Sequence, residues 1–321
     1  MTDMYVAAMN ENGGIYHYKA DESFNLKLVK KYDIEMPMYI IRRGNTMHII
    51  TQNSPQNDGN GGYLTAKIAD DGSLYDISVK VSSEGKSVCH LYADESAAYC
   101  VNYSSGSICK IGEKLVTHTG NTGPHKTRQD MPHTHFVNAS PDGKYILVCD
   151  LGLDKIMVYD KGLKFLSSAN VPAGHGARTL EYSKDGKTVY CANELTGTVT
   201  VFSYNDGTLI PKGTYASIPE EYRSTNTAAA IRLSDDEKYL YISNRGHDSI
   251  AIFEVNTDKS LQLKSIVPCG GKHPRDFNIY GKYLVCANMH SDTLTVFERV
   301  NDTLIQRSEY KTEGGPLCVM F

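Results

Sequence analysis

Four residues of types that can transfer protons and bind anions stand at related places in a repeated sequence pattern: His135, Arg178, Glu194 and Arg245. An imidazole titrates near neutral pH, so His135 can accept a proton from water and return it to a leaving group. The guanidinium groups of Arg178 and Arg245 stay charged and donate in a fixed fork, which suits a phosphate, a carboxylate or a developing oxyanion. Glu194 can orient an arginine or the histidine, or can act as the base if burial raises its pKa. The division of roles between His135 and Glu194 stays open.

Each of these residues also has a purely structural interpretation. An arginine at a strand end can be a solvated charge or half of an ion pair between neighbouring repeat units. His135 can be a loop histidine held by hydrogen bonds, and Glu194 can be no more than the salt-bridge partner of Arg178. Charged residues that recur at one end of a repeat are hard to explain by packing, so we interpret these four as a candidate site.

The elements that position these residues are units of an internal repeat. Each unit has a strand of small residues that ends in Asn or Asp, then a turn, then a β-branched strand that ends near an aromatic residue. The clearest units begin at Gly143, Gly186, Glu237 and Gly281. The anchor residues at the ends of the first of these strands are Asn10, Asn53, Asn102, Asp150, Asn193, Asn244 and Asn288. Spacings of roughly 40 to 50 residues are typical of the four-stranded blade of a propeller.

The two ends of the chain complete this repeat. A single antiparallel blade cannot bury both of its faces, so the units must stack on one another in a ring. Residues 314–321 resemble the first strand of a unit, and residues 5–18 resemble the next two strands. We therefore predict an all-β fold with almost no helix: a seven-bladed β-propeller with four-stranded antiparallel blades, forming one domain over residues 1–321. Its last blade joins both chain ends and removes open sheet edges.

The repeat also predicts that the four polar residues meet. His135 and Arg178 stand at the start of the innermost strand of neighbouring blades, whereas Glu194 and Arg245 each follow an anchor Asn at the end of a second strand. In an antiparallel pair the start of one strand lies beside the end of the next. All four side chains should therefore face the same mouth of the central channel.

A second group of residues is predicted to bind substrate: His90, His133, His175, His247 and Arg275. Arg275 holds the same repeat position as Arg178, and His90 matches the start of an innermost strand. His133 stands two residues before His135 and should point to the same face of an extended strand. This pair suggests a metal site, but no further cluster of Asp, Glu or Cys stands at ligand spacing, so we expect no metal and no cofactor. His175 and His247 lie in turns near the same end.

Composition and charge narrow the classes of partner. The formal net charge is −4, with 33 basic and 37 acidic residues interspersed, so there is no long basic stripe for nucleic acid. No apolar run approaches the roughly 18 residues of a membrane span, and the first residues lack the order of a signal peptide. The eight cysteines form no CxxC pair, and we interpret them as small core residues in a reducing compartment. We expect a cytoplasmic protein that binds neither nucleic acid nor membrane.

The chain has no tryptophan, which excludes the ordinary WD-repeat propeller. Its sequence motifs instead resemble those of the seven-bladed lactonase family, which groups bacterial cycloisomerase-type 6-phosphogluconolactonases with fungal carboxymuconate lactonizing enzymes. The stretches that carry the resemblance are residues 128–135 (RQDMPHTH), 174–178 (GHGAR), 193–195 (NEL), 243–249 (SNRGHDS) and 273–277 (HPRDF). The resemblance covers essentially the whole chain and implies a metal-free channel site built from His135, Arg178, Glu194 and Arg245.

The reaction that this resemblance implies is metal-free hydrolysis of an anionic sugar lactone, with 6-phosphogluconolactone as the first candidate. Water attacks the lactone carbonyl, so the site must take a proton from water and hold negative charge on the oxyanion. Two alternatives stay open. In a carboxymuconate-type lactonizing cycloisomerase the same arginines would hold a dicarboxylate while a proton is delivered to carbon. In a propeller used as a binding platform, the channel residues would carry no catalysis.

Overall fold

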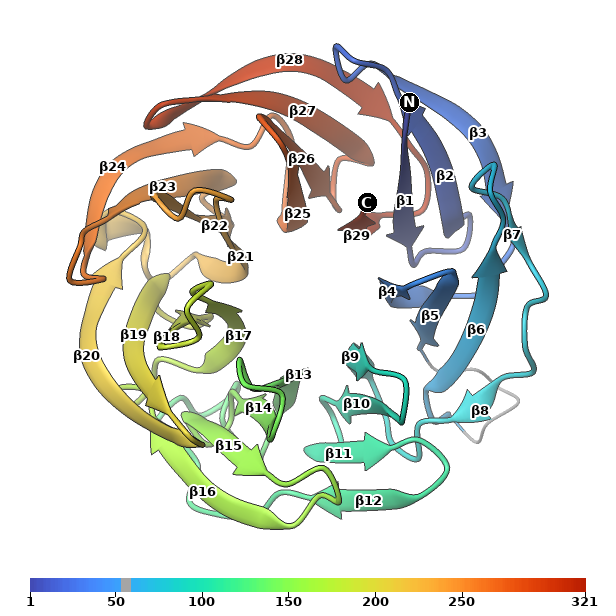
Figure 1. The fold of residues 1–321 in the computed structure, drawn as a ribbon. Helices are drawn as coiled ribbons and strands as arrows, with labels where there is room; N and C mark the ends of the chain where they lie inside the picture. The colour runs from blue at the N-terminus through green and yellow to red at the C-terminus, as the bar shows by residue number, and fades with distance from the viewer. Residues whose placement is uncertain (53–58) are drawn as a thin grey trace.

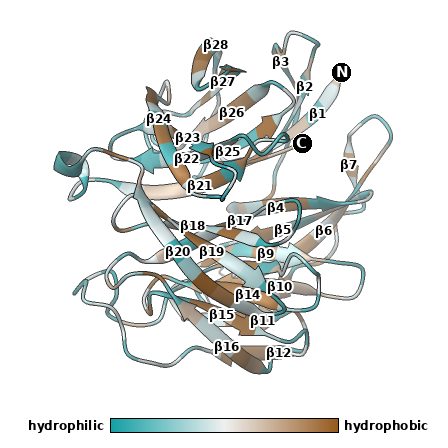
Figure 2. Cartoon of the chain, turned by 60° about the vertical axis from the view of Figure 1, so that its left-hand side comes forward, coloured by the Kyte–Doolittle hydropathy of each residue, from teal (hydrophilic) through white to brown (hydrophobic). Residues whose placement is uncertain are grey.

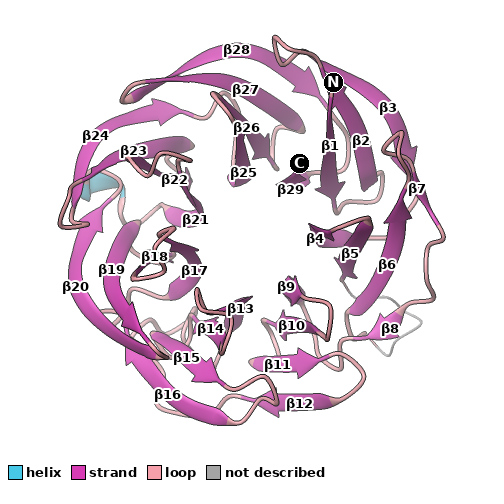
Figure 3. Ribbon diagram, viewed as in Figure 1, coloured by secondary structure: helices cyan, strands magenta, loops and turns pink. Residues whose placement is uncertain are grey.

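The chain forms a ring of seven antiparallel blades around a central channel (Figure 1). This is a computed structural model, and it describes residues 1–52 and 59–321, so the expected anchor Asn53 lies outside the described residues. Strands dominate the ribbon in Figure 3, and the helix drawn there is the short 3-10 turn Glu220–Tyr222. The prediction of an all-β, seven-bladed propeller is confirmed.

The strands follow one order in every blade, from the channel to the rim. The blade that joins the chain ends contains β29 (Pro316–Met320), β1 (Thr2–Ala8), β2 (Gly14–Ala20) and β3 (Leu26–Tyr32). The next two contain β4 (Pro37–Arg43), β5 (Thr46–Thr51), β6 (Gly62–Ile68), β7 (Leu74–Tyr75) and β8 (Val81–Ser82), then β9 (Val88–Ala93), β10 (Ala98–Asn102), β11 (Ser107–Lys110) and β12 (Lys114–Thr117). The fourth and fifth contain β13 (Thr134–Ala139), β14 (Ile146–Asp150), β15 (Lys155–Tyr159) and β16 (Phe165–Asn170), then β17 (Ala177–Tyr182), β18 (Thr188–Asn193), β19 (Thr198–Asn205) and β20 (Thr208–Ala216). The last two contain β21 (Thr227–Leu233), β22 (Tyr239–Arg245), β23 (Ser249–Val255) and β24 (Leu261–Pro268), then β25 (Pro274–Tyr280), β26 (Tyr283–Asn288), β27 (Thr293–Val300) and β28 (Thr303–Lys311).

The ring closes within the blade that contains both termini, as predicted from the repeat. Strand β29 pairs with β1 in an antiparallel register that sets Tyr5 opposite Met320 and Ala7 opposite Cys318. The pairing continues past the strands, because the backbone N–H of Asn10 donates to the carbonyl of Gly314 at 2.7 Å. The two ends of the chain therefore share one sheet, in which β29 covers the inner edge of β1.

One blade departs from the four-stranded pattern. Its outermost position is divided between two short strands, because β7 pairs with one end of β6 and β8 pairs with the other. Strand β7 spans two residues and β8 spans two residues, so neither could cover the edge of β6 alone. The prediction of four-stranded blades thus holds for the ring as a whole, with this outer strand interrupted.

The repeated aromatic residue and the repeated anchor residue have separate structural roles. Phe202, Phe253 and Phe297 occupy equivalent positions on the third strands and are at most 1 % exposed, so they pack in the apolar layers between blades. Burial of such large rings is the main apolar contribution to blade stacking. In Figure 2 the apolar colour lies along the strands and the polar colour along many of the loops. The anchor side chain of Asn193 donates to the hydroxyls of Thr198 and Thr200 at 2.9 and 2.8 Å, which ties the second strand to the third.

Each of the seven innermost strands carries a register irregularity near its start, where one or two residues have no pairing partner on the second strand. A β-bulge of this kind bends the strand and re-aims the unpaired side chain. The positions are Leu317, Met38, Cys89, His135, Arg178, Ala229 with Ala230, and Arg275. We call this set the bulge ring. Three predicted site residues, His135, Arg178 and Arg275, belong to it.

Candidate active site

The bulge ring divides the channel wall into two arcs. Leu317, Met38 and Cys89 come from three consecutive blades and form an apolar arc, whereas His135, Arg178 and Arg275 lie on the other side of the ring. The bulge explains why these charged side chains face the channel, because regular pairing would have alternated them with their neighbours between the two faces of the blade. A ligand in the channel therefore meets cationic groups on one side and small apolar groups on the other.

Two connected cavities lie along this wall. The outer cavity has a volume of about 280 Å³ and lies at the mouth where the innermost strands begin; it is lined by Met38, Gln52, Ser87, Cys89, Tyr103, Arg128, His135, Glu194, Arg245 and Arg275. The inner cavity shares Met38, Cys89, His135 and Arg275 with the outer one and has a volume of about 30 Å³. A space of that size holds little more than one or two waters. The outer cavity is therefore the one that can take a small molecule.

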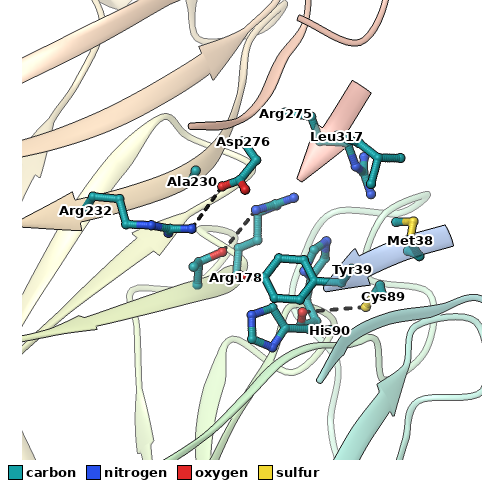
Figure 4. A pocket seen from close by; sticks show the side chains of 12 residues that line it. Met38, Tyr39, Cys89, His90, Arg178, Ala230, Arg232, Arg275, Asp276 and Leu317 are labelled. Carbon is teal, nitrogen blue, oxygen red and sulfur yellow. Dashed lines mark hydrogen bonds and ion pairs between the residues drawn. The ribbon is translucent and has the colours of Figure 1, made fainter. Parts of the chain in front are cut away.

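The floor of the channel is formed by the inner cavity, which Figure 4 shows from close by. His90 packs between the rings of Tyr39 and Phe136, with centroid distances of 4.2 and 4.3 Å. On the opposite side an ion pair of 3.0 Å joins Arg232 to Asp276. These contacts narrow the channel beneath the outer cavity to the small inner one.

Glu194 is the centre of an arginine cluster. Its Oε2 atom lies 2.8 Å from Nε of Arg178 and 3.0 Å from Nη2 of Arg245, and its Oε1 atom accepts from Nη2 of Arg128. Glu194 is only 2 % exposed. Burial alone would raise the pKa of this carboxyl, but Arg245, Arg178, His135 and Arg128 outweigh burial and hold the pKa well below its usual value. Glu194 is therefore an ionised carboxylate and a weak proton acceptor.

Main-chain carbonyls of β21 fix the two inner arginines. Nη1 of Arg178 donates to the carbonyl of Ala229 at 2.7 Å, and Nη2 of Arg245 donates to the carbonyl of Ala228 at 2.8 Å. Burial lowers the pKa of Arg245 to about 10, so its guanidinium is still charged at neutral pH. Because each fork is bonded to both the carboxylate and a main-chain oxygen, the positive charges are held in place before a ligand arrives.

His135 lies against this cluster without being hydrogen-bonded to it. Its Nε2 atom is 3.9 Å from Oε2 of Glu194, and its ring meets the edge of Tyr103 with centroids 5.7 Å apart. Burial lowers the pKa of His135 well below 6.5, and Arg178 lowers it further, while Glu194 acts in the opposite direction. The imidazole is therefore neutral near pH 7 and can accept a proton.

Arg128 is a member of the cluster that the sequence reasoning missed. It stands in the connection of residues 118–133, the longest described segment between two blades. Its Nη2 atom donates both to Glu194 and, at 3.3 Å, to the hydroxyl of Tyr103. The unusual length of this connection was the available signal, because long loops in a compact fold often carry binding residues.

The second group of predicted residues is only partly brought together. Arg275 lines both cavities, and His90 lines the inner one. The expectation that His133 would point with His135 into the channel is wrong. The ring of His133 stacks on Tyr103 at 4.3 Å, and its two nitrogens lie 3.0 Å from the carbonyl of Tyr103 and 3.0 Å from Asp130. His133 is absent from the lining of both cavities, because the bulge at His135 breaks the simple alternation of the strand.

His175 and His247 also lie outside the two cavities. Nδ1 of His175 is 3.1 Å from the hydroxyl of Thr198, and Nδ1 of His247 is 2.8 Å from the hydroxyl of Ser249. Each partner belongs to the same blade as the histidine. The structure therefore places both residues in turns at the rim, where they bond to their own blade.

The cysteines and possible metal ligands were surveyed over residues 1–52 and 59–321. All eight cysteines are free and buried. All eight belong to the buried apolar core, as expected, and Cys89 also occupies the bulge ring and lines both cavities. Within the same residues, no three side chains of His, Cys, Asp or Glu gather closely enough to hold a metal ion. No described helix has the length and apolarity of a membrane span.

Comparison with known proteins agrees with the fold. Residues 3–321 match the family model for the seven-bladed β-propeller lactonases. An uncharacterised protein of Staphylococcus aureus (strain USA300) is 36 % identical over 100 % of both chains. A crystal structure from Bacteroides fragilis, described as that of a candidate 6-phosphogluconolactonase, is 29 % identical and has a TM-score of 0.89, covering 99 % of this chain and 97 % of the other.

A periplasmic gluconolactonase from Pseudomonas aeruginosa shares the same architecture. It has a TM-score of 0.90 over 99 % of this chain and 98 % of its own, but at 24 % identity the likeness supports the fold alone. The family match, by contrast, spans nearly every residue from the first strand to the last. The chain belongs to the seven-bladed β-propeller lactonase family.

Proposed function

We propose that this protein hydrolyses the ester bond of an anionic sugar lactone, with 6-phosphogluconolactone as the first candidate substrate. The observation that carries the proposal is the meeting, in one cavity, of a neutral buried imidazole with guanidinium groups that outnumber the carboxylates of the described lining residues. The membership of the lactonase family supports the reaction class. The cationic wall supports a substrate with negative charge.

His135 is the proposed general base. Its neutral ring takes a proton from the attacking water as the water oxygen bonds to the lactone carbonyl carbon. When the tetrahedral intermediate collapses, the bond from carbon to the ring oxygen breaks, and the protonated His135 returns the proton to the departing alkoxide. The product is the open hydroxy acid, and the enzyme regains its neutral imidazole.

Arg178, which lines the inner cavity, and Arg245, which lines the outer one, are the proposed donors to an oxyanion held where the two cavities meet beside His135. Their charges are fixed by Glu194 and by main-chain carbonyls, so little reorganisation is needed as negative charge develops. Glu194 is proposed to position the arginines rather than to act as a base, because its pKa lies well below the usual value. The arginine charges can perform the task that a Lewis-acid metal performs in other hydrolases, so the proposed mechanism needs no metal.

A direct assay tests this proposal. The purified protein is mixed with freshly prepared 6-phosphoglucono-δ-lactone, and the rate of acid release is measured above the uncatalysed background. Saturating turnover that falls by roughly 100-fold in His135→Ala would support the hydrolase. If no lactone is opened, a muconate dicarboxylate assay tests the lactonizing cycloisomerase, since the same arginines could hold a dicarboxylate. Failure of both reactions would leave a binding platform as the function.

The proposed location is the cytoplasm. Its support is the set of eight free cysteines, which suits a reducing compartment. Fractionation of cells that express the native chain tests this location. Recovery of the protein in a periplasmic or secreted fraction would contradict it.

A further inference from the structure

Arg275 differs from every other arginine of the chain in its contacts. The other nine arginine side chains each donate to an oxygen of a carboxylate, a carbonyl or a hydroxyl: Arg42, Arg43, Arg128, Arg178, Arg223, Arg232, Arg245, Arg299 and Arg307. The Arg275 side chain makes no hydrogen bond or ion pair with any described residue. It is half-buried and lines both channel cavities. A channel-facing guanidinium to which the described part of the chain offers no partner is available to a ligand.

The electrostatic surroundings of Arg275 favour an anion. Burial lowers its pKa to about 10, and the nearby charge of Arg245 is the next cause of that lowering. The two groups come from neighbouring blades, with Arg245 at the end of β22 and Arg275 in the bulge of β25. No described residue accepts a hydrogen bond from Nη1 of Arg245. An anion between the two guanidiniums would therefore relieve repulsion between like charges and satisfy free donors on both.

The charge of the site indicates which anion fits. Among the described residues that line the two cavities, Arg232 and Asp276 pair with each other, which leaves four guanidiniums against the carboxylate of Glu194: those of Arg128, Arg178, Arg245 and Arg275. A phosphate monoester carries about −1.5 to −2 at neutral pH. Together with one developing oxyanion it would nearly balance the remaining positive charge. A carboxylate in its place would leave a full charge uncompensated.

We propose that Arg275, together with one of the two N–H groups on Nη1 of Arg245, binds the phosphate group of the substrate and selects phosphorylated over unphosphorylated lactones. The second N–H group of that nitrogen remains for the oxyanion. The assignment of this phosphate to a lactone rests on the proposed function. Binding of the anion itself does not require catalysis and can be tested separately.

The first experiment measures binding of inorganic phosphate by thermal unfolding at pH 7.5 and constant ionic strength. We expect phosphate to raise the unfolding midpoint of the native protein by roughly 2 °C or more at saturation, because a ligand that binds only the folded state stabilises it. Arg275→Gln should lose this shift. Arg307→Gln is the matched control, because Arg307 lies on β28, the outermost strand of the same blade, and pairs with Glu298 of β27. This variant should keep the phosphate-induced shift of the unfolding midpoint.

The second experiment compares substrates. In Arg275→Gln the preference for 6-phosphoglucono-δ-lactone over glucono-δ-lactone, as the ratio of kcat/KM values, should fall by roughly 30-fold or more through a raised KM. An undiminished phosphate shift in Arg275→Gln, or an equal shift with acetate, would overturn the inference even if lactone hydrolysis were found. Loss of the phosphate shift in a protein that opens no lactone would support the anion site and reject the proposed function.

Discussion

Nε2 of His135 lies 3.9 Å from Oε2 of Glu194, too far for a hydrogen bond, although the two side chains are only 8 % and 2 % exposed. The carboxylate is instead bonded to Arg178 and Arg245. The imidazole of His135 is therefore not oriented by a hydrogen bond to Glu194, in contrast to the histidine of a Ser-His-Asp triad. The neutral ring of His135 lines the cavity, while Glu194 binds the guanidiniums of Arg178 and Arg245.

The first prediction concerns the pH dependence of activity. Because burial and Arg178 depress the pKa of His135 well below 6.5, the neutral base is present at pH 6.5 and above. We expect kcat/KM to be level from about pH 6.5 until Arg245, with a pKa of about 10, loses its charge, and to fall at more acidic pH as the base becomes protonated. His135→Ala should lower kcat by roughly 100-fold or more and remove this acid limb. A histidine with a structural role would instead lower thermal stability and leave the pH profile unchanged.

The second prediction concerns the two inner arginines. Replacing either Arg178 or Arg245 by Ala should lower kcat by roughly 100-fold or more, as does the loss of an oxyanion donor. Lys keeps the charge but loses the fork that bridges Glu194 and a main-chain carbonyl, so it should recover only part of the activity. Steady-state kinetics on each folded variant tests this. Near-native turnover in all four variants would contradict the proposed oxyanion role.

The third prediction concerns Glu194 and stability. Glu194→Gln removes the only carboxylate among residues 1–52 and 59–321 that is bonded to the arginine cluster, so it should lower the free energy of unfolding by about 3–5 kcal/mol in urea titrations at pH 7. The native carboxyl has a pKa below the value of 4.5 expected when unfolded. Its stabilisation is therefore complete above pH 4.5 and is lost as the pH falls through the native pKa.

A matched surface substitution separates this effect from a general one. Glu298→Gln also removes a carboxylate that pairs with basic residues, Lys282 and Arg307, but it does so on the surface. It should change the urea midpoint far less, because solvent screens exposed pairs. Equal effects of the two substitutions on the urea midpoint would show that the buried cluster contributes no more to stability than the surface ion pairs do.

The fourth prediction concerns ring closure. Deleting residues 316–321 removes β29, which is buried along its whole length, and exposes the inner edge of β1. We expect a lower thermal midpoint and aggregation, because an unpaired strand edge and its apolar faces become accessible. Size-exclusion chromatography and light scattering measure both. A monomeric truncated protein with an unchanged midpoint would be inconsistent with closure by β29.

The fifth prediction concerns metal ions. Dialysis of the native enzyme against a chelator should leave lactone hydrolysis unchanged, since the proposed mechanism relies on arginine charge. The control is a parallel sample dialysed without chelator and assayed at the same protein concentration. Activity that is lost on chelation and restored by one divalent ion would replace the arginine mechanism with a metal-assisted one.

The repeat in the sequence was sufficient to predict the fold and to predict that several of the site residues lie close together. The anchors Asn193 and Asn244 locate the ends of second strands, so Glu194 and Arg245 could be predicted to reach the same mouth as Arg178. The structure joins all three through Oε2 of Glu194. This inference succeeded because strand ends in a propeller recur in a fixed geometry that depends on the local pattern alone.

Other features of the site depend on contacts that no local pattern encodes. The bulges that aim His135 and Arg275 into the channel arise from strand register, and the place of Arg128 depends on the path of a long connection. His133 stacks on Tyr103, a residue of the preceding blade, instead of lining the cavity. The absence of a described partner for Arg275 emerges only after every nearby side chain has been placed. The sequence by itself therefore determined the ring and the end of the channel at which the catalytic candidates lie. Tertiary packing decided which charged side chains are paired and which are left for a ligand, because pairing depends on distances between residues far apart in the chain.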